Sequence, residues 1–540
     1  MPDGTSALSA PVLIVGGGPV GLALAGDLGA RGIDSILVEQ TDGVTDHPRA
    51  NAQNARSMEF FRRWGIAEAV RAASSPPDFP HTALYLTSLN GHELARFERP
   101  QHGGQQRSAI SPERPQRCNQ VRLDPILMQF AQRSGRCDLR FRTRFERLAI
   151  SGDTVRSQVT DLATSETYPI ETSYVVACCG GKSSIRRDLG LSFVGEPDLE
   201  KNINLFLRIP ELWTFHDKGR ASLHFLIGES GHWAVLGDLD GRELWRLTVN
   251  SDEYFEHPER LNLDDLLMKV VGRKIPYEFL SWRTWIARGL VASAYQAGPV
   301  FLAGDAAHQN PPNGGFGLNT GLGDIFDLSW KLAATLQGWG GSRLLETYDM
   351  ERRPVAQRNV RESVASLRDD QAIPRFADLD EDGAVAAEHR NLVGNQIRET
   401  KRRMLISDGI ALGYVYSGSP ICVGSSEQKA PAETMVYEPR VVPGARAPHI
   451  WLTPDQSILD FFGEGFTLLD FTDDERRAGG IEGAFAVGGV PFSRLSIRNR
   501  EARDLYGCSF VLVRPDGHIA WAGDTFPSDL ERLVDQVRGA

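Results

Sequence analysis

The segment from Pro11 to Gln40, PVLIVGGGPVGLALAGDLGARGIDSILVEQ, constrains the fold of this chain more than any other part of it. Residues 12–15 form a short apolar run without alternation, which is typical of a parallel strand buried on both faces. Gly16, Gly18 and Gly21 follow with G-x-G-x-x-G spacing. In that pattern the first glycine makes a tight turn, the second lets the backbone approach a pyrophosphate, and the third lets the helix pack against the strand. The segment therefore predicts a dinucleotide-binding unit.

The residues around the glycines predict how the charge and the ribose of the dinucleotide are bound. Pro19 opens a helix, and the N-terminus of a helix favours negative charge. The second strand, SILVE, ends at Glu39, eighteen residues after Gly21, where a carboxylate binds ribose hydroxyls; Gln40 follows directly. These residues leave open whether the dinucleotide is a nicotinamide that comes and goes or a flavin that stays.

Composition narrows the class of partner. The chain has 540 residues and a formal net charge of −11, and nucleic acids and anionic membranes both require a basic face, so we expect small-molecule partners instead. The sequence holds no apolar run of about 18 residues and its first ten residues carry no basic cluster, so we expect no membrane association and a cytoplasmic location. The six cysteines show no metal-ligand spacing, and we expect no metal.

The pattern of strands and turns predicts three units. A dinucleotide-binding domain is expected from residues 8–195 and 291–415, with an excursion at 75–115 toward the second unit. Short strands broken by turns predict an inserted antiparallel sheet at 196–290. A segment rich in Ser, Pro and Gly marks a linker at 416–440. Residues 441–540 have strands and helices of their own and form the third unit.

A second glycine-rich stretch lies far downstream, at Gly298 to Leu336. Residues 300–303 again predict a buried strand, and Gly304 and Asp305 place a carboxylate at its carboxyl end, where open α/β sheets bind ligands. The loop NPPNGGFG then leads into an apolar helix. Such a loop exposes backbone N–H groups to a flat ligand, and the N-terminus of the helix favours negative charge.

With these two stretches in order, the chain resembles the group A flavoprotein monooxygenases of the para-hydroxybenzoate hydroxylase and phenol hydroxylase type over nearly its whole length. The resemblance implies an α/β fold in which a Rossmann-like FAD-binding domain carries an inserted antiparallel-sheet substrate domain. It implies noncovalent FAD, transient NADH or NADPH, and O₂ that reacts through a flavin hydroperoxide with a small phenolic or aromatic substrate. No second G-x-G-x-x-G is present, so no separate nicotinamide domain is expected.

The resemblance also implies which residues contact FAD. The adenosine diphosphate half would be held by Gly16, Gly18, Pro19, Gly21, Glu39 and Gln40, with Arg49 facing the diphosphate. Gln120 and Asp305, which follows Gly304, would contact the ribityl chain. Pro312 would line the substrate side of the flavin ring, and the loop from Gly315 to the N–H groups of Gly317, Leu318 and Asn319 would face its N1 and O2 edge.

The group that deprotonates a phenolic substrate is not identified by the sequence. A base or a hydrogen-bond relay is needed because phenolate is the better nucleophile. We consider His224, Tyr295, His47 and Arg246 as candidates, with Pro312 as a further residue of the catalytic site. His308 lies closer to the flavin loop in sequence, and its counterpart in the family serves the architecture of that loop. The identity of the substrate stays open, from simple phenols to polycyclic polyketides.

Two positions depart from the family pattern. Cys179, in VVACCGGKSSIRRDLG, stands where relatives carry an aspartate that is implicated in FAD and nicotinamide binding, whereas Lys182, Ser183 and Arg186 follow the pattern. We interpret Cys179 and its neighbour Cys178 as small apolar filling rather than as a redox pair. Asp327 stands where relatives commonly carry asparagine, and we interpret it as a tolerated polar exchange.

The third unit resembles the thioredoxin-like domain that phenol hydroxylase relatives append. It lacks C-x-x-C and Cys508 stands alone, so we expect no redox exchange there. Because such a domain contributes to subunit association in relatives, a homodimer is expected. Two alternatives to aromatic hydroxylation stay open: oxygen insertion beside a ketone or epoxidation in polyketide tailoring, and a flavin-binding protein that has lost nicotinamide-driven monooxygenation.

Overall fold

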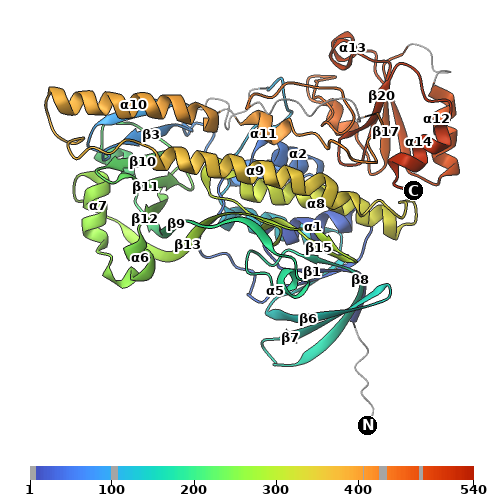
Figure 1. Ribbon diagram of the computed structural model, residues 1–540, viewed down its shortest axis with the longest axis horizontal. Coiled ribbons are helices and arrows are strands. Elements are labelled where there is room, and N and C mark those ends of the chain that lie inside the picture. Colours follow the sequence, from blue (N-terminus) through green and yellow to red (C-terminus); the bar gives the residue numbers. More distant parts are fainter. Residues whose placement is uncertain (1–7, 99–106, 406, 425–434, 473–477) are drawn as a thin grey trace.

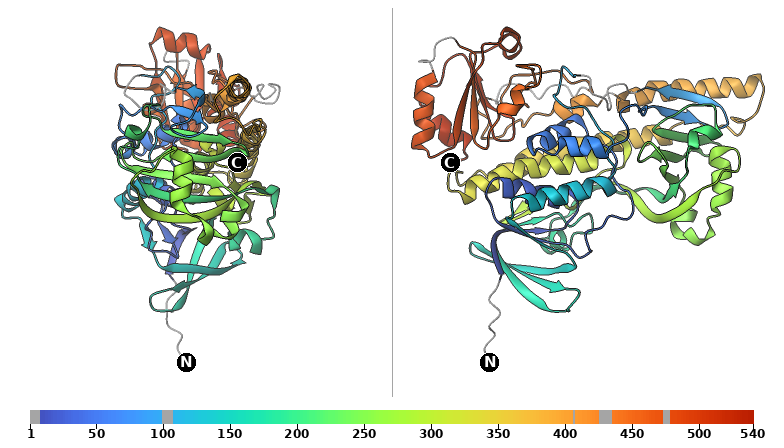
Figure 2. Two further views of the ribbon diagram at one scale, coloured as in Figure 1. Left: turned by 90° about the vertical axis from the view of Figure 1, so that its left-hand side faces the viewer. Right: turned by 180° about the vertical axis from the view of Figure 1, so that it is seen from behind.

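A computed structural model describes residues 8–98, 107–405, 407–424, 435–472 and 478–540 of the chain (Figure 1). Residues 425–434 of the predicted linker and 99–106 of the predicted excursion lie outside the described residues. The described residues form three β-sheets. The third sheet and the second lie at opposite ends of the molecule, and the long helices α8 (Phe316–Leu336) and α9 (Thr347–Gln371) run between them (Figures 1 and 2).

The first sheet forms the dinucleotide-binding domain. Its parallel core has the order β15-β8-β1-β2-β5, and β14 extends one edge antiparallel to β15. Strand β1 is completely buried from Val12 to Val15, as a strand covered on both faces must be. Strands β6 and β7 form a hairpin that joins this sheet through β8. The strands are β1 (Leu8–Val15), β2 (Ser35–Val38), β5 (Cys137–Arg140), β6 (Thr143–Ser151), β7 (Thr154–Asp161), β8 (Thr167–Ala177), β14 (Gln296–Ala297) and β15 (Val300–Leu302).

Helices cover both this sheet and the glycine turn. Helix α1 (Pro19–Ala30) follows the turn and packs against α4 (Gln120–Arg133) and α8 (Phe316–Leu336). Helix α2 (Ala55–Arg63) leads into α3 (Ala67–Ala73), and α5 (Ser184–Asp188) follows β8. The Phe60 and Phe326 rings stack at 4.1 Å between α2 and α8, so these two helices share one core.

The second sheet is mostly antiparallel and has the order β16-β13-β9-β12-β11-β10-β3-β4. Among its described strands, one pair is parallel and joins β10 to β3, which comes from the excursion. Its strands are β3 (Ala83–Leu86), β4 (Glu93–Phe97), β9 (Phe193–Arg208), β10 (Leu223–Gly228), β11 (Gly231–Asp238), β12 (Leu244–Asn250), β13 (Glu278–Ala292) and β16 (His308–Gln309). Helices α6 (Asp252–Glu256) and α7 (Leu263–Val271) accompany one face, and α10 (Ala384–Leu405) packs on β4.

The third sheet has four strands in the order β18-β17-β19-β20, with β17 parallel to β18 and antiparallel to β19. Helices α12 (Gly479–Val487) and α14 (Leu530–Val537) pack together on one face, and α13 (Arg500–Tyr506) packs on the other. The strands are β17 (Phe466–Asp470), β18 (Phe492–Ser496), β19 (Phe510–Val513) and β20 (Ile519–Gly523). A four-stranded sheet with helices on both faces is what the predicted thioredoxin-like domain requires, and the thioredoxin-like assignment stays a prediction.

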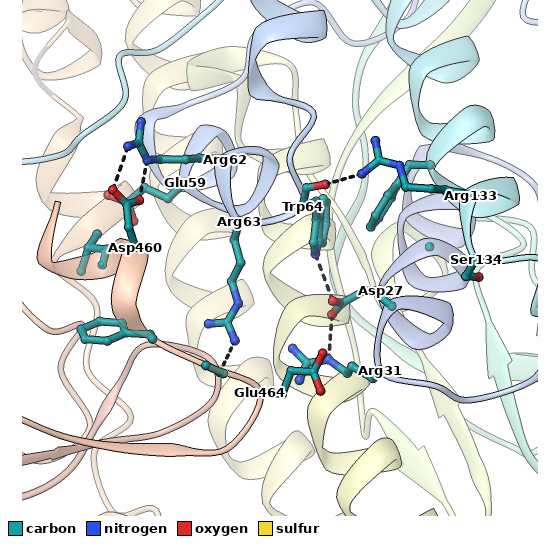
Figure 3. A pocket seen from close by; sticks show the side chains of 16 residues that line it. Asp27, Arg31, Glu59, Arg62, Arg63, Trp64, Arg133, Ser134, Asp460 and Glu464 are labelled. Carbon is teal, nitrogen blue, oxygen red and sulfur yellow. Dashed lines mark hydrogen bonds and ion pairs between the residues drawn. The ribbon is translucent and has the colours of Figure 1, made fainter. Parts of the chain in front are cut away.

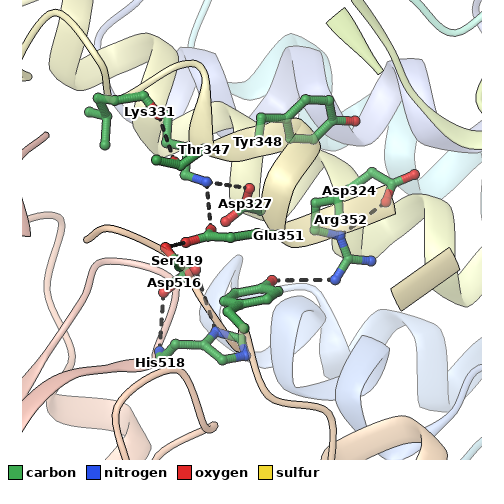
Figure 4. A network of polar contacts seen from close by, with 12 residues as sticks. Asp324, Asp327, Lys331, Thr347, Tyr348, Glu351, Arg352, Ser419, Asp516 and His518 are labelled. Carbon is green, nitrogen blue, oxygen red and sulfur yellow. Dashed lines mark hydrogen bonds and ion pairs between the residues drawn. The ribbon is translucent and has the colours of Figure 1, made fainter. Parts of the chain in front are cut away.

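A cluster of buried charges joins the third domain to α8 and α9 (Thr347–Gln371) (Figure 4). Arg514, in the turn between β19 and β20, donates to Glu351 Oε1 at 2.6 Å and to Asp327 Oδ1 at 3.0 Å. Lys331 Nζ donates to Asp327 Oδ2 at 2.7 Å and to Glu351 Oε2 at 2.6 Å. Asp516 accepts a further bond from Arg514 at 2.6 Å. Asp327 on α8 therefore contacts a cation of the third domain. The sequence analysis interpreted this residue as a tolerated polar exchange and did not predict the contact.

The charges in this cluster are completely removed from water. None of the five side chains is more than 1% exposed, so burial raises the pKa of Asp327 well above its usual range. Arg514 and Lys331 overcome the effect of burial at Glu351 and hold the pKa of that carboxyl below its usual range. The carboxyl oxygen atoms of Asp327, Glu351 and Asp516 lie within 4.8 Å of one another, and these three groups share the two cations Arg514 and Lys331.

No helix in the described part of the chain is long and apolar enough to cross a membrane.

We expect Arg514→Met to lower the free energy of unfolding by about 3–5 kcal/mol, because it leaves buried carboxylates without their shared cation. Urea unfolding followed by intrinsic fluorescence measures the change. Arg500→Met is the matched control, since the Arg500 side chain is 93% exposed and its loss should matter by no more than about 0.5 kcal/mol. Equal unfolding curves for the two variants would contradict a structural role for the cluster.

Candidate active site

The glycine turn after β1 is closed to any side chain at two of its positions. Gly16 has φ +115°, and a Cβ there would lie 2.4 Å from the carbonyl oxygen of Cys178. A Cβ at Gly21 would lie 2.0 Å from the Gly16 carbonyl oxygen. At Gly18, by contrast, a Cβ would meet no protein atom within 4 Å. The turn therefore packs tightly against the strands behind it and leaves open space in front of Gly18, as a pyrophosphate-binding turn requires.

A cavity of about 530 Å³ opens in front of this turn. Its walls come from the glycine turn, the segment after β2, the start of α4 and the segment after β8; they include Gly16, Gly18, Glu39, Gln40, Arg49, Gln120, Cys179 and Lys182. Glu39 lies at the rim, where its carboxylate accepts from the N–H groups of Gly17 and Thr41, both at 2.8 Å. The structure thus brings most of the predicted adenosine diphosphate residues to one cavity.

Positive charge in this cavity is available to a bound anion. The Arg49 side chain is exposed to the cavity and makes no ion pair within the described ranges. The N-terminus of α1 lies at the same turn, with Gly18 as its N-cap and Pro19 as its first residue. Because a helix N-terminus and an unpaired guanidinium both favour phosphate oxygens, these residues fit the diphosphate of FAD.

Asp305 and Gln120 occupy the next stretch of the site. Asp305 lies in the short 3-10 turn Gly304–Ala306 after β15, with its side chain exposed. Gln120 Nε2 donates to Asp124 Oδ2 at 3.1 Å, which turns its Oε1 toward other partners. An exposed carboxylate and an oriented amide are suitable acceptors for the hydroxyl groups of a ribityl chain.

The flavin loop enters α8 through a turn that requires glycine. Gly314 and Gly315 have φ of +83° and +67°. Helix α8 begins at Phe316, two residues before the position after the NPPNGGFG loop, Leu318, at which the sequence predicts that the helix starts. Gly317 and Leu318 thus lie in the first helical turn, where backbone N–H groups have no intrahelical acceptor. Pro312 is exposed just before the turn.

Asn319 ties this loop to the segment before α2. Its Oδ1 accepts from the Asn54 N–H at 2.9 Å and from Ser57 Oγ at 2.7 Å, and its Nδ2 donates to the Ala52 carbonyl at 3.0 Å. The Asn319 side chain is therefore saturated by protein contacts, and only its backbone faces the predicted cofactor position.

One face of the second sheet lies against the 46–49 segment of the cavity wall. His47 contacts Ser281 Oγ at 2.9 Å, Arg283 pairs with Asp46 at 2.9 Å, and Arg246 donates to the Arg49 carbonyl at 2.6 Å. Cross-strand pairing places further side chains on this face in one row, formed by Phe225, Val235, Thr248, Asn204 and Arg283. We call this the substrate face.

Two of the four candidate bases lie at the substrate face. His47 is 3% exposed, and burial together with Arg283 and Arg246 lowers its pKa to about 4. Its Nε2 has no hydrogen-bond partner within the described residues. Burial and the neighbouring Arg117 lower the pKa of Arg246 to about 10. Both groups thus carry unsatisfied hydrogen-bonding capacity beside the predicted flavin.

The structure does not bring His224 and Tyr295 to this site. His224 belongs to the row with Leu236, Leu247 and Leu205, which lies on the opposite face of the sheet in a core shared with α7. The Tyr295 ring packs against Tyr348 with centroids 5.8 Å apart, inside the core of the first domain. Strand periodicity alone did not tell the two faces apart, because both are apolar along β10.

Cys179 lines the cavity as a neutral thiol. Its Sγ donates to Ser183 Oγ at 3.0 Å, and burial raises its pKa. Arg186 is occupied elsewhere: it donates to the Leu191 carbonyl at 2.6 Å and its guanidinium stacks 3.9 Å over the Phe193 ring. Lys182 and Arg186 are the two cations that follow the family pattern in this motif, and of these two Lys182 lines the cavity.

Asp324 is a site residue that sequence reasoning missed. It is completely buried on α8 and accepts from the Gly304 N–H at 3.3 Å, from His308 Nε2 at 3.0 Å and from Arg352 Nε at 3.0 Å. It therefore fixes the turn that carries Asp305, together with His308, whose Nδ1 contacts Asn310 Oδ1 at 3.1 Å. The available signal was a run of charged residues, Asp324, Asp327 and Lys331, inside a helix that is mostly apolar.

A second groove of about 520 Å³ lies between α1, α2, α4 and the third domain (Figure 3). Its charges neutralise one another: Arg62 pairs with Asp460 at 2.6 Å, and Arg31 with Asp27 at 3.4 Å. Arg133 and Arg63 donate to backbone carbonyls of Trp64 and Gly463. We interpret this groove as part of the contact between two domains rather than as a ligand site.

Comparison with known proteins identifies the family. Residues 9–363 match the family described as FAD binding domain, and residues 440–540 match the aromatic-ring hydroxylase C-terminal family. The chain belongs to the FAD-dependent aromatic-ring hydroxylases. It is 30% identical to the FAD-dependent monooxygenase apdD of Emericella nidulans over 98% of this chain and 90% of that one. It is 31% identical to 4-methyl-5-nitrocatechol 5-monooxygenase of Burkholderia sp, over 98% and 97% of the two chains.

Solved structures of relatives agree over the full length of this hydroxylase. RebC soaked with chromopyrrolic acid and holding 7-carboxy-K252c superposes with a TM-score of 0.92 at 39% identity, covering 99% of this chain and 100% of that one. The flavin-dependent monooxygenase PieE, in complex with FAD and substrate, superposes with a TM-score of 0.88 at 27% identity, covering 100% of both chains. The predicted fold class, the family and the FAD cofactor are thereby confirmed.

We expect Gly18→Ala in this hydroxylase to weaken FAD binding by at least about tenfold while the apoprotein still folds. The added methyl meets no protein atom, yet it occupies the space in front of the turn where a phosphate must approach. As N-cap of α1, alanine should cost the apoprotein no more than about 1 kcal/mol. Fluorescence titration with FAD and thermal unfolding of the apoprotein measure the two quantities; unchanged FAD affinity would contradict the placement of the diphosphate.

Proposed function

We propose that this protein hydroxylates an aromatic substrate that carries an acidic group, using NADH or NADPH and O₂. The observation that carries the proposal is Arg246. Its guanidinium lies at the substrate face, makes a hydrogen bond only to the Arg49 carbonyl, and has no carboxylate within 4 Å among the described residues. A desolvated cation of this kind gains most from an anionic ligand that forms paired hydrogen bonds with it.

The surroundings of Arg246 support an aromatic acid. Phe206, which pairs with Arg246 across the strands and contacts the His47 ring, and Thr248 on the same face are half-buried, and an aromatic ring with a hydroxyl group nearby suits a flat ring system. Arg117 lies near Arg246 and is itself buried, and burial lowers its pKa. The similar protein RebC holds a carboxylated polycyclic ligand, 7-carboxy-K252c. By this proposal, the substrate is a carboxylated aromatic compound of one or more rings.

The protein groups have separate tasks in the proposed reaction. Bound FAD supplies the redox chemistry with NAD(P)H and O₂. Glu39, Arg49, Gln120 and Asp305 would hold the cofactor, and the backbone N–H groups of Gly317 and Leu318 would stabilise negative charge on its ring. His47 is neutral near pH 7 because its pKa is about 4, so its ring, held by Ser281, serves as a hydrogen-bond relay for the phenolic proton.

The proposal includes several further expectations from the sequence. These are the domain limits at 8–195, 196–290, 291–415 and 441–540, a homodimer, a cytoplasmic location, and oxidation of the nicotinamide without a dedicated domain. Oxygen insertion beside a ketone and epoxidation are the alternatives within the same chemistry, and product analysis separates them. A flavin protein without nicotinamide-driven monooxygenation is the alternative of another class.

We expect aromatic acids that carry a phenolic hydroxyl to stimulate NAD(P)H oxidation and to be hydroxylated, whereas their methyl esters are poor substrates. Arg246→Met should raise KM for the acid by roughly 10- to 150-fold, because a charge-assisted hydrogen bond contributes about 1.5–3 kcal/mol. It should leave the weak activity on esters unchanged. Arg242→Met, an exposed arginine before the same strand, is the control. If acids and esters are used equally well by the wild type, the acidic-substrate proposal fails.

We expect Cys179→Ser to change the rate of anaerobic flavin reduction by no more than a few-fold. The hydroxyl keeps a hydrogen bond to Ser183, and a thiol of raised pKa supplies no charge that serine would remove. Stopped-flow reduction by NADH and by NADPH, with and without an aromatic acid, measures the rate. A loss of orders of magnitude would show that the thiolate takes part, and absence of reduction in the wild type would favour the alternative without monooxygenation.

A further inference from the structure

The buried carboxylate of Asp370, near the C-terminal end of α9, contacts two residues from separate elements, the half-buried Asn313 and the buried Lys401. Asp370 Oδ2 accepts from Asn313 Nδ2 at 2.7 Å, and Asn313 opens the turn Asn313–Gly315 of the flavin loop. Asp370 Oδ1 lies 2.8 Å from Lys401 Nζ, on α10. The side chains of Asp370 and Lys401 are 2% and 1% exposed. One carboxylate thus bridges the flavin loop and α10.

Helix α10 covers the distal part of the substrate face. Val393 and Ile397 pack in one core with Tyr85 and Phe225, and Phe225 belongs to the row that defines this face. The helix lies close to β4, because a Cβ at Gly394 would be 2.3 Å from the Leu94 carbonyl oxygen. Lys401 also donates to the Ser366 carbonyl at 2.8 Å, so α10 and the end of α9 form one support. Asp370 therefore connects the cover of the substrate face to the flavin loop.

We propose that Asp370 is a positioning residue that sets the orientation of the Asn313 carboxamide and holds the flavin-facing turn against α9 and α10. An ionised carboxylate only accepts hydrogen bonds, so the NH₂ end of Asn313 must face it. The carbonyl oxygen of the amide then points away from Asp370, and it has no hydrogen-bond partner in the part of the chain that the structure describes. Without the carboxylate, either end of the amide can face the cofactor. This inference rests on the FAD placement proposed above.

The glycines beside Asn313 make such a support necessary. Gly314 and Gly315 both adopt positive φ, and glycine gives the turn little intrinsic stiffness. On one side Asn319 holds the Gly315 carbonyl at 2.6 Å, and on the other Asp370 holds Asn313. A buried ion pair by itself is weak support for stability, since an apolar pair of similar volume often replaces it without loss. The hydrogen bond to Asn313 is the part of the arrangement that such a replacement would not reproduce.

The test uses the full-length protein and free FAD as the probe. We compare Asp370→Asn, the double variant Asp370→Asn/Lys401→Met, and Asn313→Ala. The matched control is Asp369→Asn, since Asp369 is the neighbouring acid and makes no side-chain hydrogen bond or ion pair with any residue that the structure describes. Thermal unfolding of the apoprotein reports stability. The FAD dissociation constant and the absorption bands of bound FAD report the position of the loop.

We expect Asp370→Asn to unfold at lower temperature, because Lys401 is left buried and unpaired, and the double variant to recover most of that loss. FAD binding should be weaker by about tenfold in both variants and in Asn313→Ala, with shifted absorption bands, because one charge-assisted hydrogen bond is missing in each. The control should match the wild type in both readouts.

If the double variant recovers FAD affinity together with stability, Asp370 has only a structural role and the inference is overturned. Wild-type FAD affinity in Asp370→Asn would overturn it as well. A wild-type protein that does not bind FAD would instead refute the proposed function, so the two failures are distinguishable.

Discussion

Two carboxylates one helical turn apart on α8 connect the parts of this molecule. Asp324 accepts from the Gly304 N–H, His308 and Arg352, and so fixes the turn that presents Asp305. Asp327, three residues later, accepts from Lys331 and from Arg514 of the third domain. Because residues three apart share a helix face, one buried surface of α8 serves both the cofactor loop and the domain contact. The cofactor site and the attachment of the third domain therefore depend on the same helix.

The local signals in the sequence predict both the FAD cofactor, which the comparisons confirm, and the residues of the cofactor half of the site, which stay a prediction. The glycine spacing at Gly16, Gly18 and Gly21 and the Gly304-Asp305 pair report backbone conformations and strand ends that short-range chemistry dictates. Of these residues, Gly16 and Gly18 line the cavity in front of the turn. The substrate half was less predictable, because both faces of β10 are apolar and only the strand pairing shows that Phe225, and not His224, lies on the same face of the sheet as Arg283.

Contacts between residues far apart in sequence could not be derived from the sequence. Arg514 approaches Asp327 across 187 positions, and Asn313 approaches Asp370 across 57. Each of these side chains has an ordinary neighbourhood in the sequence, and a charged residue on a helix is usually solvated. These side chains form their contacts because they are buried, and a charge that is removed from water requires a hydrogen-bonding or ionic partner. The unpaired Arg246 is informative for the same reason: it is a partly desolvated cation whose partner is expected to come from the substrate.

The central claim, that this protein transfers one oxygen atom from O₂ to an aromatic acid, is tested most directly by isotope incorporation. The purified protein is incubated with NAD(P)H and a phenolic acid under ¹⁸O₂, and the product is analysed by mass spectrometry. We predict a hydroxylated acid that carries one ¹⁸O atom, with none incorporated when the label is in water. A product labelled from water, or nicotinamide oxidation that yields only hydrogen peroxide with every acid tried, would contradict the claim.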